Sequence, residues 1–173
     1  LDATTTTGYL TAVGYYALSA NTTGTENVAV GYGSLIKNTT GDKNTSVGYD
    51  ALGENTTADE NTALGYYSLN VNTTGAENTA VGSYSLYNNT TGSSNVAVGR
   101  NAAGANTTAS HNTAVGKSAL SASQTGGSNT AIGKDALANN TTNYNTAVGK
   151  DAAKANTTGS QNTVVGMDAL TSN

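Results

Sequence analysis

The tripeptide Asn-Thr-Thr is the most frequent candidate for chemistry in this chain, because it matches the Asn-x-Ser/Thr pattern of N-glycan acceptors. Two interpretations stay open. Asn, Thr and Gly are the residues that a tight turn needs, and a repeated turn would copy them. Alternatively, the asparagines carry a regular column of glycans, which would make the chain a carbohydrate-coated filament protomer. The candidate glycosylation sites are Asn21, Asn38, Asn55, Asn72, Asn89, Asn106, Asn140 and Asn156.

Threonine is the second candidate, since a flat array of threonines binds ice when two per strand face the same surface. The paired threonines, such as Thr90 and Thr91, are adjacent, so a strand would point them to opposite sides. A further threonine column, represented by Thr79, alternates with Val81, and we expect it in the interior. Ice or carbohydrate binding by a Thr-rich surface is therefore the lesser alternative.

Residues of catalytic or metal-binding type are few and isolated. The segment 116–118, Gly-Lys-Ser, resembles the end of a phosphate-binding loop, but His111 stands where that motif requires glycine. His111 is the only histidine, and we expect it on the surface of a variable spacer. Asp135, Asp151 and Asp168 occur one per repeat without a partner carboxylate, and cysteine is absent. We predict no enzyme, no metal site and no cofactor.

Composition narrows the class of protein further. Seven basic and eleven acidic side chains give a net charge of −4, so the chain lacks the basic stripe of a nucleic-acid-binding protein. No apolar run approaches the roughly 18 residues of a membrane span. Threonine and asparagine supply 54 of the 173 residues, and phenylalanine, tryptophan and proline are absent. Something other than a bulky aromatic core must order the chain.

An internal repeat settles the architecture. The unit reads Asn-Thr-Ala-Val-Gly-x-x-Ala-Leu-x-x-Asn-Thr-Thr-Gly-x-x. Successive key glycines are 17 residues apart, except for one spacing of 16 between Gly133 and Gly149. No linker interrupts the period, so residues 1–173 form a single repeat array. The units are anchored at Gly14, Gly31, Gly48, Gly65, Gly82, Gly99, Gly116, Gly133, Gly149 and Gly166.

A 17-residue unit with two glycines is too short for a helical pair, so we predict an all-β fold: a parallel β-roll or β-solenoid of about ten coils. Alternation along the strand places Thr and Val on one face and Asn, Ala and Gly on the other. We expect two core columns. One contains Val13, Val30, Val47, Leu64, Val81, Val98, Val115, Ile132, Val148 and Val165. The other contains Leu18, Leu35, Leu52, Leu69, Leu86, Leu120, Leu137 and Leu170.

A lone coil cannot be stable, because ordering 17 residues costs about 1–2 kcal/mol each in backbone entropy, far more than a few buried aliphatic groups return. Stacked coils instead pair each strand with its copy about 4.8 Å away. We expect the columns of asparagines to hydrogen-bond along the stack.

The residue after the key glycine changes along the chain. It is tyrosine in the early units and a cation in later ones, where aspartate often follows. This is either a solvated face of little consequence or a graded contact surface. The residues concerned are Tyr15, Tyr32, Tyr49, Tyr66, Arg100, Lys117, Lys134 and Lys150.

The unit core Asn-Thr-Ala-Val-Gly-x-x-Ala, at 112–119 and 145–152, resembles the head repeats of YadA-like trimeric autotransporter adhesins, and related arrays occur in fibre proteins. The resemblance covers residues 10–170. It implies a left-handed parallel β-roll, three of which pack around an axis into an extracellular adhesive head. The family's usual repeat is about 14 residues, whereas this one is 17 and contains an added Asn-Thr-Thr-Gly loop.

Together these patterns predict an extracellular or cell-surface structural and adhesive fibre element. The expected partners are further copies of the chain, in a homotrimer or an end-to-end filament, and host or surface glycans or matrix. We expect no nucleic acid partner and no membrane span in this segment. Both ends of the sequence fall inside a repeat, which predicts a segment of a longer array or a protomer that stacks end to end.

Overall fold

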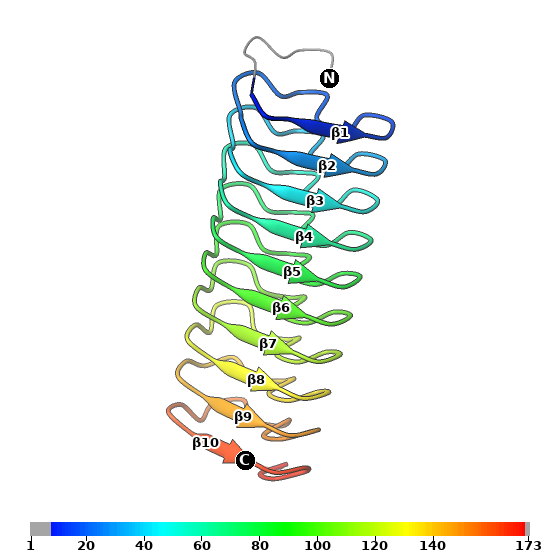
Figure 1. Ribbon diagram of the computed structural model, residues 1–173. Helices are drawn as coiled ribbons and strands as arrows, with labels where there is room; N and C mark the ends of the chain where they lie inside the picture. The colour runs from blue at the N-terminus through cyan, green and yellow to red at the C-terminus, as the bar shows by residue number, and fades with distance from the viewer. Residues whose placement is uncertain (1–7, 172–173) are drawn as a thin grey trace.

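A computed structural model describes residues 8–171, which form a rod of stacked coils with all strands on one side (Figure 1). Each coil contributes one three-residue strand and then irregular turns. The strands form one sheet in chain order, which confirms the all-β parallel solenoid. They are β1 (Thr11–Val13), β2 (Val28–Val30), β3 (Thr45–Val47), β4 (Thr62–Leu64), β5 (Thr79–Val81), β6 (Val96–Val98), β7 (Thr113–Val115), β8 (Thr130–Ile132), β9 (Thr146–Val148) and β10 (Thr163–Val165).

Every strand pairs in parallel with its neighbours at identical repeat positions, so Thr79 of β5 lies opposite Val96 of β6. The 16-residue unit keeps this alignment: Thr130 of β8 pairs with Thr146 of β9. In other turns a glycine or alanine carbonyl accepts the interior side-chain donors, usually two asparagine amides, as the Gly92 carbonyl does from Asn78 and Asn89 at 2.9 Å each. In the short turn the Thr142 carbonyl accepts them instead, from Asn129 at 2.8 Å and Asn140 at 2.7 Å. One residue is thus removed without moving the strand.

The interior is a narrow column of leucine and alanine. The predicted leucine column is confirmed: its members are fully buried except Leu170 in the last turn, which is 40% exposed. Ala103 and Ala153 occupy the leucine position in two turns and are equally buried. The central strand residue, typified by Ala80 and Ala114, also points inward.

The predicted valine column is not in the core. Alternation did place Thr and Val on one face, but that face is the outside of the rod. Strands β5 and β7 show the pattern: the central alanine is buried and the residues on both sides are half-buried. The physical reason is that each three-residue strand has a single inward position, which its central residue fills, so the residues on both sides of it must face outward. The residues concerned are Val13, Val30, Val47, Leu64, Val81, Val98, Val115, Ile132, Val148 and Val165.

Tight corners depend on backbone with positive φ. The glycine that ends each strand has a φ near +130°, and a Cβ on Gly82 would lie 2.8 Å from the carbonyl carbon and oxygen of Gly99 in the next turn. The leucines of the core column also have positive φ, 51° at Leu18 and 50° at Leu137. Such a conformation costs a non-glycine residue about 1–2 kcal/mol, which burial of a leucine, worth about 1.5–3 kcal/mol, offsets.

Two ladders of buried asparagines run along the rod, the loop ladder with Ser123 in place of one asparagine, and confirm the expected hydrogen bonding along the stack. In the loop ladder, Nδ2 of Asn38 donates to Oδ1 of Asn21 at 2.9 Å and to the carbonyl of Gly41 at 3.0 Å. In the ladder before the strands, the backbone N–H of Asn44 donates to Oδ1 of Asn27 at 2.8 Å. These bonds supply hydrogen-bond partners to the side-chain and backbone polar groups that the thin coil buries.

Candidate functional site

The outward residues of the ten strands form a continuous surface, which we call the strand face. Each strand contributes its first and third residues, usually threonine and valine. Several of the third residues are more than one-third exposed, including Val13, Leu64, Val98, Ile132 and Val165. Within residues 8–171 the threonine hydroxyls of the strands donate no hydrogen bond to protein, unlike those of the loops. The face is therefore apolar and regular, with free hydroxyls, and extends about 43 Å over nine steps of about 4.8 Å.

Next to the strand face, the two residues after each key glycine form a corner whose chemistry changes along the rod. Backbone hydrogen bonds hold successive corners in line: the Ser118 N–H donates to the Arg100 carbonyl at 3.0 Å, and the Asp135 N–H donates to the Lys117 carbonyl at 3.0 Å. Side chains at equivalent corner positions are thus fixed one turn apart, whatever their type.

In the first five turns these corners carry a tyrosine ladder: Tyr15, Tyr16, Tyr32, Tyr49, Tyr66, Tyr67, Tyr84 and, beside it, Tyr87. The rings of Tyr32 and Tyr49 are 5.0 Å apart and 9° from parallel, and those of Tyr49 and Tyr66 are 5.4 Å apart. Because the rings stack along the rod, most of them cover each other's faces and present edges and hydroxyls to solvent. Tyr84 closes the ladder, since its ring partners Tyr66, Tyr67 and Tyr87 all lie in its own turn or the preceding one.

The tyrosine ladder also perturbs titration. Burial among the rings raises the pKa of Tyr67 to about 12, and the neighbouring Tyr66, Tyr49 and Asp50 add to the effect. Burial likewise raises the pKa of Asp50, although a hydrogen bond with Tyr67 opposes that shift. This corner therefore favours the neutral, protonated forms of Tyr67 and Asp50.

In the later turns the corners carry a cation column of Arg100, Lys117, Lys134 and Lys150. The last two are paired: Lys134 Nζ lies 2.8 Å from Asp135, and Lys150 Nζ lies 2.8 Å from Asp151. Hydrogen bonds from Lys150 and Lys154 lower the pKa of Asp151 to about 2. Arg100 and Lys117 have no ion pair within residues 8–171, because their corner neighbours are the uncharged Asn101 and Ser118.

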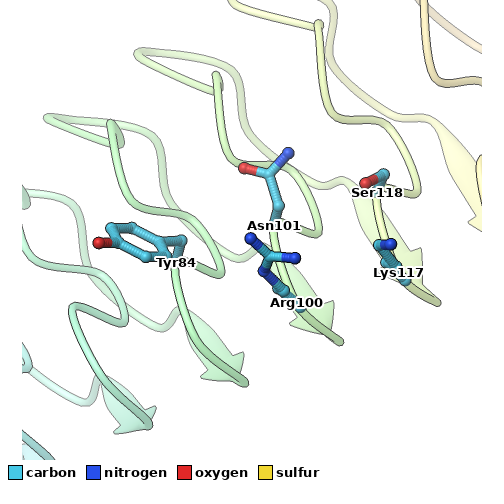
Figure 2. A pocket seen from close by; sticks show the side chains of 5 residues that line it. All are labelled: Tyr84, Arg100, Asn101, Lys117 and Ser118. Atoms are coloured by element: carbon cyan, nitrogen blue, oxygen red, sulfur yellow. The ribbon is translucent and has the colours of Figure 1, made fainter.

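A cavity of about 190 Å³ opens where the tyrosine ladder meets the cation column. Figure 2 shows Arg100 and Asn101 between Tyr84 on one side and Lys117 and Ser118 on the other, so three consecutive turns line the cavity. Sequence reasoning missed this site. It placed Arg100 and Lys117 in the column after the key glycine, with a graded contact surface as one alternative, and took Gly-Lys-Ser at 116–118 for a chance match to a phosphate loop. It did not bring these residues together with Tyr84 and Asn101.

The candidate glycosylation sites are buried, which contradicts a glycan column on the folded rod. Each of these asparagines is at most 1% exposed, and its Nδ2 donates hydrogen bonds inside the coil, as Asn89 does to Asn72 and to the Gly92 carbonyl. A glycan on Nδ2 would replace one of the two N–H donors and would need space where the side chain is fully buried. The turn interpretation of Asn-Thr-Thr is the correct one for Asn21, Asn38, Asn55, Asn72, Asn89, Asn106, Asn140 and Asn156.

The paired threonines split as expected. Thr90 is half-buried and its hydroxyl donates to the Thr107 carbonyl of the next turn at 3.0 Å, whereas Thr91 is exposed. His111 lies on the surface, as predicted. Within residues 8–171 no three acidic or histidine side chains come close enough together to hold a metal ion. The same part of the chain contains no helix suited to crossing a membrane.

Comparisons with family models, with curated proteins and with solved structures found no match to this chain. Its function must therefore be argued from the surfaces of the rod itself.

Proposed function

We propose that this chain is an extracellular structural and adhesive fibre element whose rods associate side by side through the strand face. The observation that carries the proposal is the aliphatic column of that face, whose members are half-buried or exposed on all ten strands. Contiguous apolar patches of this length on a soluble protein generally mark interaction sites. A second copy is a fitting partner because its strand face repeats with the same step, so every turn makes the same contact.

The resemblance of the repeat core to YadA-like adhesin heads supports a homotrimer and a surface location. In a trimer, three strand faces would meet on one axis and bury the residues typified by Val81 and Val115. The buried area would grow with each turn, and a long rod would gain avidity from many weak contacts.

Sedimentation or light scattering of the full chain tests this proposal. We expect a trimer or other small oligomer, and a shift toward monomer in the variant Val47→Thr/Val81→Thr/Val115→Thr, which keeps side-chain shape but removes apolar surface. The control Thr74→Ser/Thr91→Ser alters exposed loop positions and should leave assembly unchanged. A monodisperse monomer of the unaltered chain with intact β circular dichroism would refute self-association.

Filament growth by end-to-end stacking is a compatible mode of assembly. Strands β1 and β10 each pair on one side only within residues 8–171, so either edge can accept a further turn of the same register. Electron microscopy of the full chain distinguishes short side-by-side oligomers from filaments whose length depends on protein concentration.

Ice binding is the second candidate function, favoured by the outward position of the strand threonines. The sequence made it the lesser alternative, partly because Thr79 and its equivalents were expected in the interior. That expectation was wrong, since they are half-buried and share the strand face. A flat, regular array of methyl and hydroxyl groups is what such a role requires. Thermal hysteresis that disappears in the bulky variant Thr79→Tyr/Thr113→Tyr would support it, and its absence in the unaltered chain would refute it.

A further inference from the structure

The cavity lined by Tyr84, Arg100, Asn101, Lys117 and Ser118 stands out because neither of its two cations forms an ion pair with any residue from 8 to 171. Four cations occupy equivalent corner positions, and two of them are paired with aspartate at 2.8 Å. The backbone does not account for the difference: φ is 58° at Asn101, 57° at Ser118 and 57° at Asp135. The free charge of this site therefore follows from side-chain identity alone.

A guanidinium and an ammonium that face one cavity favour an oxyanion. Arginine binds carboxylate or sulfate oxygens through two parallel N–H donors, and lysine adds a compact point charge. Stacked corners hold the two residues on adjacent turns, about 4.8 Å apart at the backbone, so one anionic group can contact both. Their backbone is fixed by hydrogen bonds to neighbouring corners, such as that from the Ser118 N–H to the Arg100 carbonyl at 3.0 Å.

The remaining walls suit a sugar ring better than a bare ion. Tyr84 ends the tyrosine ladder, so its ring lacks an aromatic neighbour in the next turn, on the side where the cavity opens. Aromatic faces pack against the C–H groups of a pyranose. The Asn101 amide and the Ser118 hydroxyl can each donate and accept hydrogen bonds, which matches the hydroxyl groups of a saccharide.

We propose that this cavity binds an acidic saccharide, with its carboxylate or sulfate on Arg100 and Lys117, a ring face on Tyr84 and hydroxyl groups on Asn101 and Ser118. The inference deepens the adhesive role proposed above and rests on that role for its biological meaning. The binding itself needs only one copy of the chain, so it can succeed or fail independently of self-association.

Titration calorimetry of the full chain with four probes tests the ligand class. The probes are a galacturonate disaccharide, a sulfated heparin disaccharide, neutral lactose and sodium sulfate. We expect at least one acidic disaccharide to bind at least tenfold tighter than both lactose and sodium sulfate, and to weaken at higher salt. Equal binding of lactose, or of free sulfate, would overturn the proposal. An acidic hexapeptide, added as a fifth probe, would overturn it by binding more tightly than the acidic disaccharides.

Matched variants test the site. Asn101→Asp/Ser118→Asp places carboxylates beside the two free cations, as the later turns do naturally, and should weaken binding of the acidic disaccharide at least tenfold with an unchanged unfolding midpoint. Lys117→Ser should also weaken it. Lys150→Ser changes the net charge equally but lies outside the cavity, so it should bind like the unaltered chain.

Equal losses in Lys117→Ser and Lys150→Ser would overturn the site in favour of general electrostatic attraction, and unchanged binding by both cavity variants would overturn it outright. Light scattering of the same samples reports assembly separately. A chain that binds as a monomer would refute self-association while supporting the site, and an oligomer without binding would do the reverse.

Discussion

The tyrosine turns, β1 to β5, and the cation turns, β6 to β9, share one framework but present different surfaces. Both regions have the same strand spacing, buried leucine or alanine column and asparagine ladders. They differ at the corners. Asp50 and Asp151 occupy the same repeat position, yet burial among tyrosines raises the pKa of Asp50, whereas lysine hydrogen bonds lower that of Asp151. The comparison teaches that the interior sets the backbone and leaves corner chemistry free to vary.

The largest expected effect tests whether the glycine column really fixes that common backbone. Gly82→Ala should cost about 1–3 kcal/mol from backbone strain and a similar amount from overpacking, because the new Cβ lies 2.8 Å from Gly99 backbone atoms. Gly166→Ala is the control: its Cβ would meet only Ala169 at 3.6 Å, so strain alone remains. Denaturant unfolding measures both. A loss no greater at Gly82 than at Gly166 would disprove the steric argument.

The second test asks whether the two regions have equal interiors. Leu69→Ala, under the tyrosine ladder, and Leu137→Ala, under the cation column, remove equivalent buried side chains and should each cost about 2–5 kcal/mol. The buried alanines at positions 103 and 153 show that the column accepts the smaller residue locally. We expect the two losses to agree closely in chemical denaturation. Clearly unequal losses would show that the surface does influence the core.

A smaller effect is expected where the loop ladder is interrupted. Asn106 Oδ1 is the one buried side-chain polar atom within residues 8–171 that has no hydrogen-bond partner, because the next turn carries Ser123 in place of asparagine. Ser123→Asn should restore the donor and raise the free energy of unfolding by about 1 kcal/mol. Ser121→Asn, at a neighbouring half-buried position outside the ladder, should give no such gain. A Ser123→Asn variant that is less stable than the unaltered chain would contradict this prediction, because it would mean that the space beside Asn106 Oδ1 is already filled.

The smallest effects concern pH. The lysines that bind Asp151 are about half exposed and Asp50 is only half-buried, so water screens the interactions of both aspartates. The lowered pKa of Asp151 means that its stabilisation is present above about pH 4 and is lost as pH falls toward 2. Asp151→Asn should therefore lower stability at pH 7 and not at pH 2. The raised pKa of Asp50 has the opposite sign, so Asp50→Asn should raise stability at pH 7 and not at pH 3. Thermal unfolding at these pH values checks both; shifts of equal sign would refute the comparison.

Particular residues show how far the sequence could be read. Spacing alone predicted the coil count, the parallel pairing and the leucine column, because a fixed period with a glycine at each corner permits little else. The valine column was misplaced because alternation defines two faces without saying which is inside, and valine is more hydrophobic than alanine. Asn-Thr-Thr looked like an acceptor pattern because a sequence does not reveal that its asparagine side chain turns inward.

Sequence by itself thus determined that this chain is a repetitive β rod with a graded surface, since periodicity is a local property that survives without coordinates. Only the tertiary structure decided which residues are covered, because burial depends on the width of the closed coil. It also decided that Arg100 and Lys117 lie beside Tyr84 without an ion pair to any described residue. The surroundings of these two cations depend on which corners become neighbours, because the fold brings residues 17 apart along the chain to within a single strand spacing.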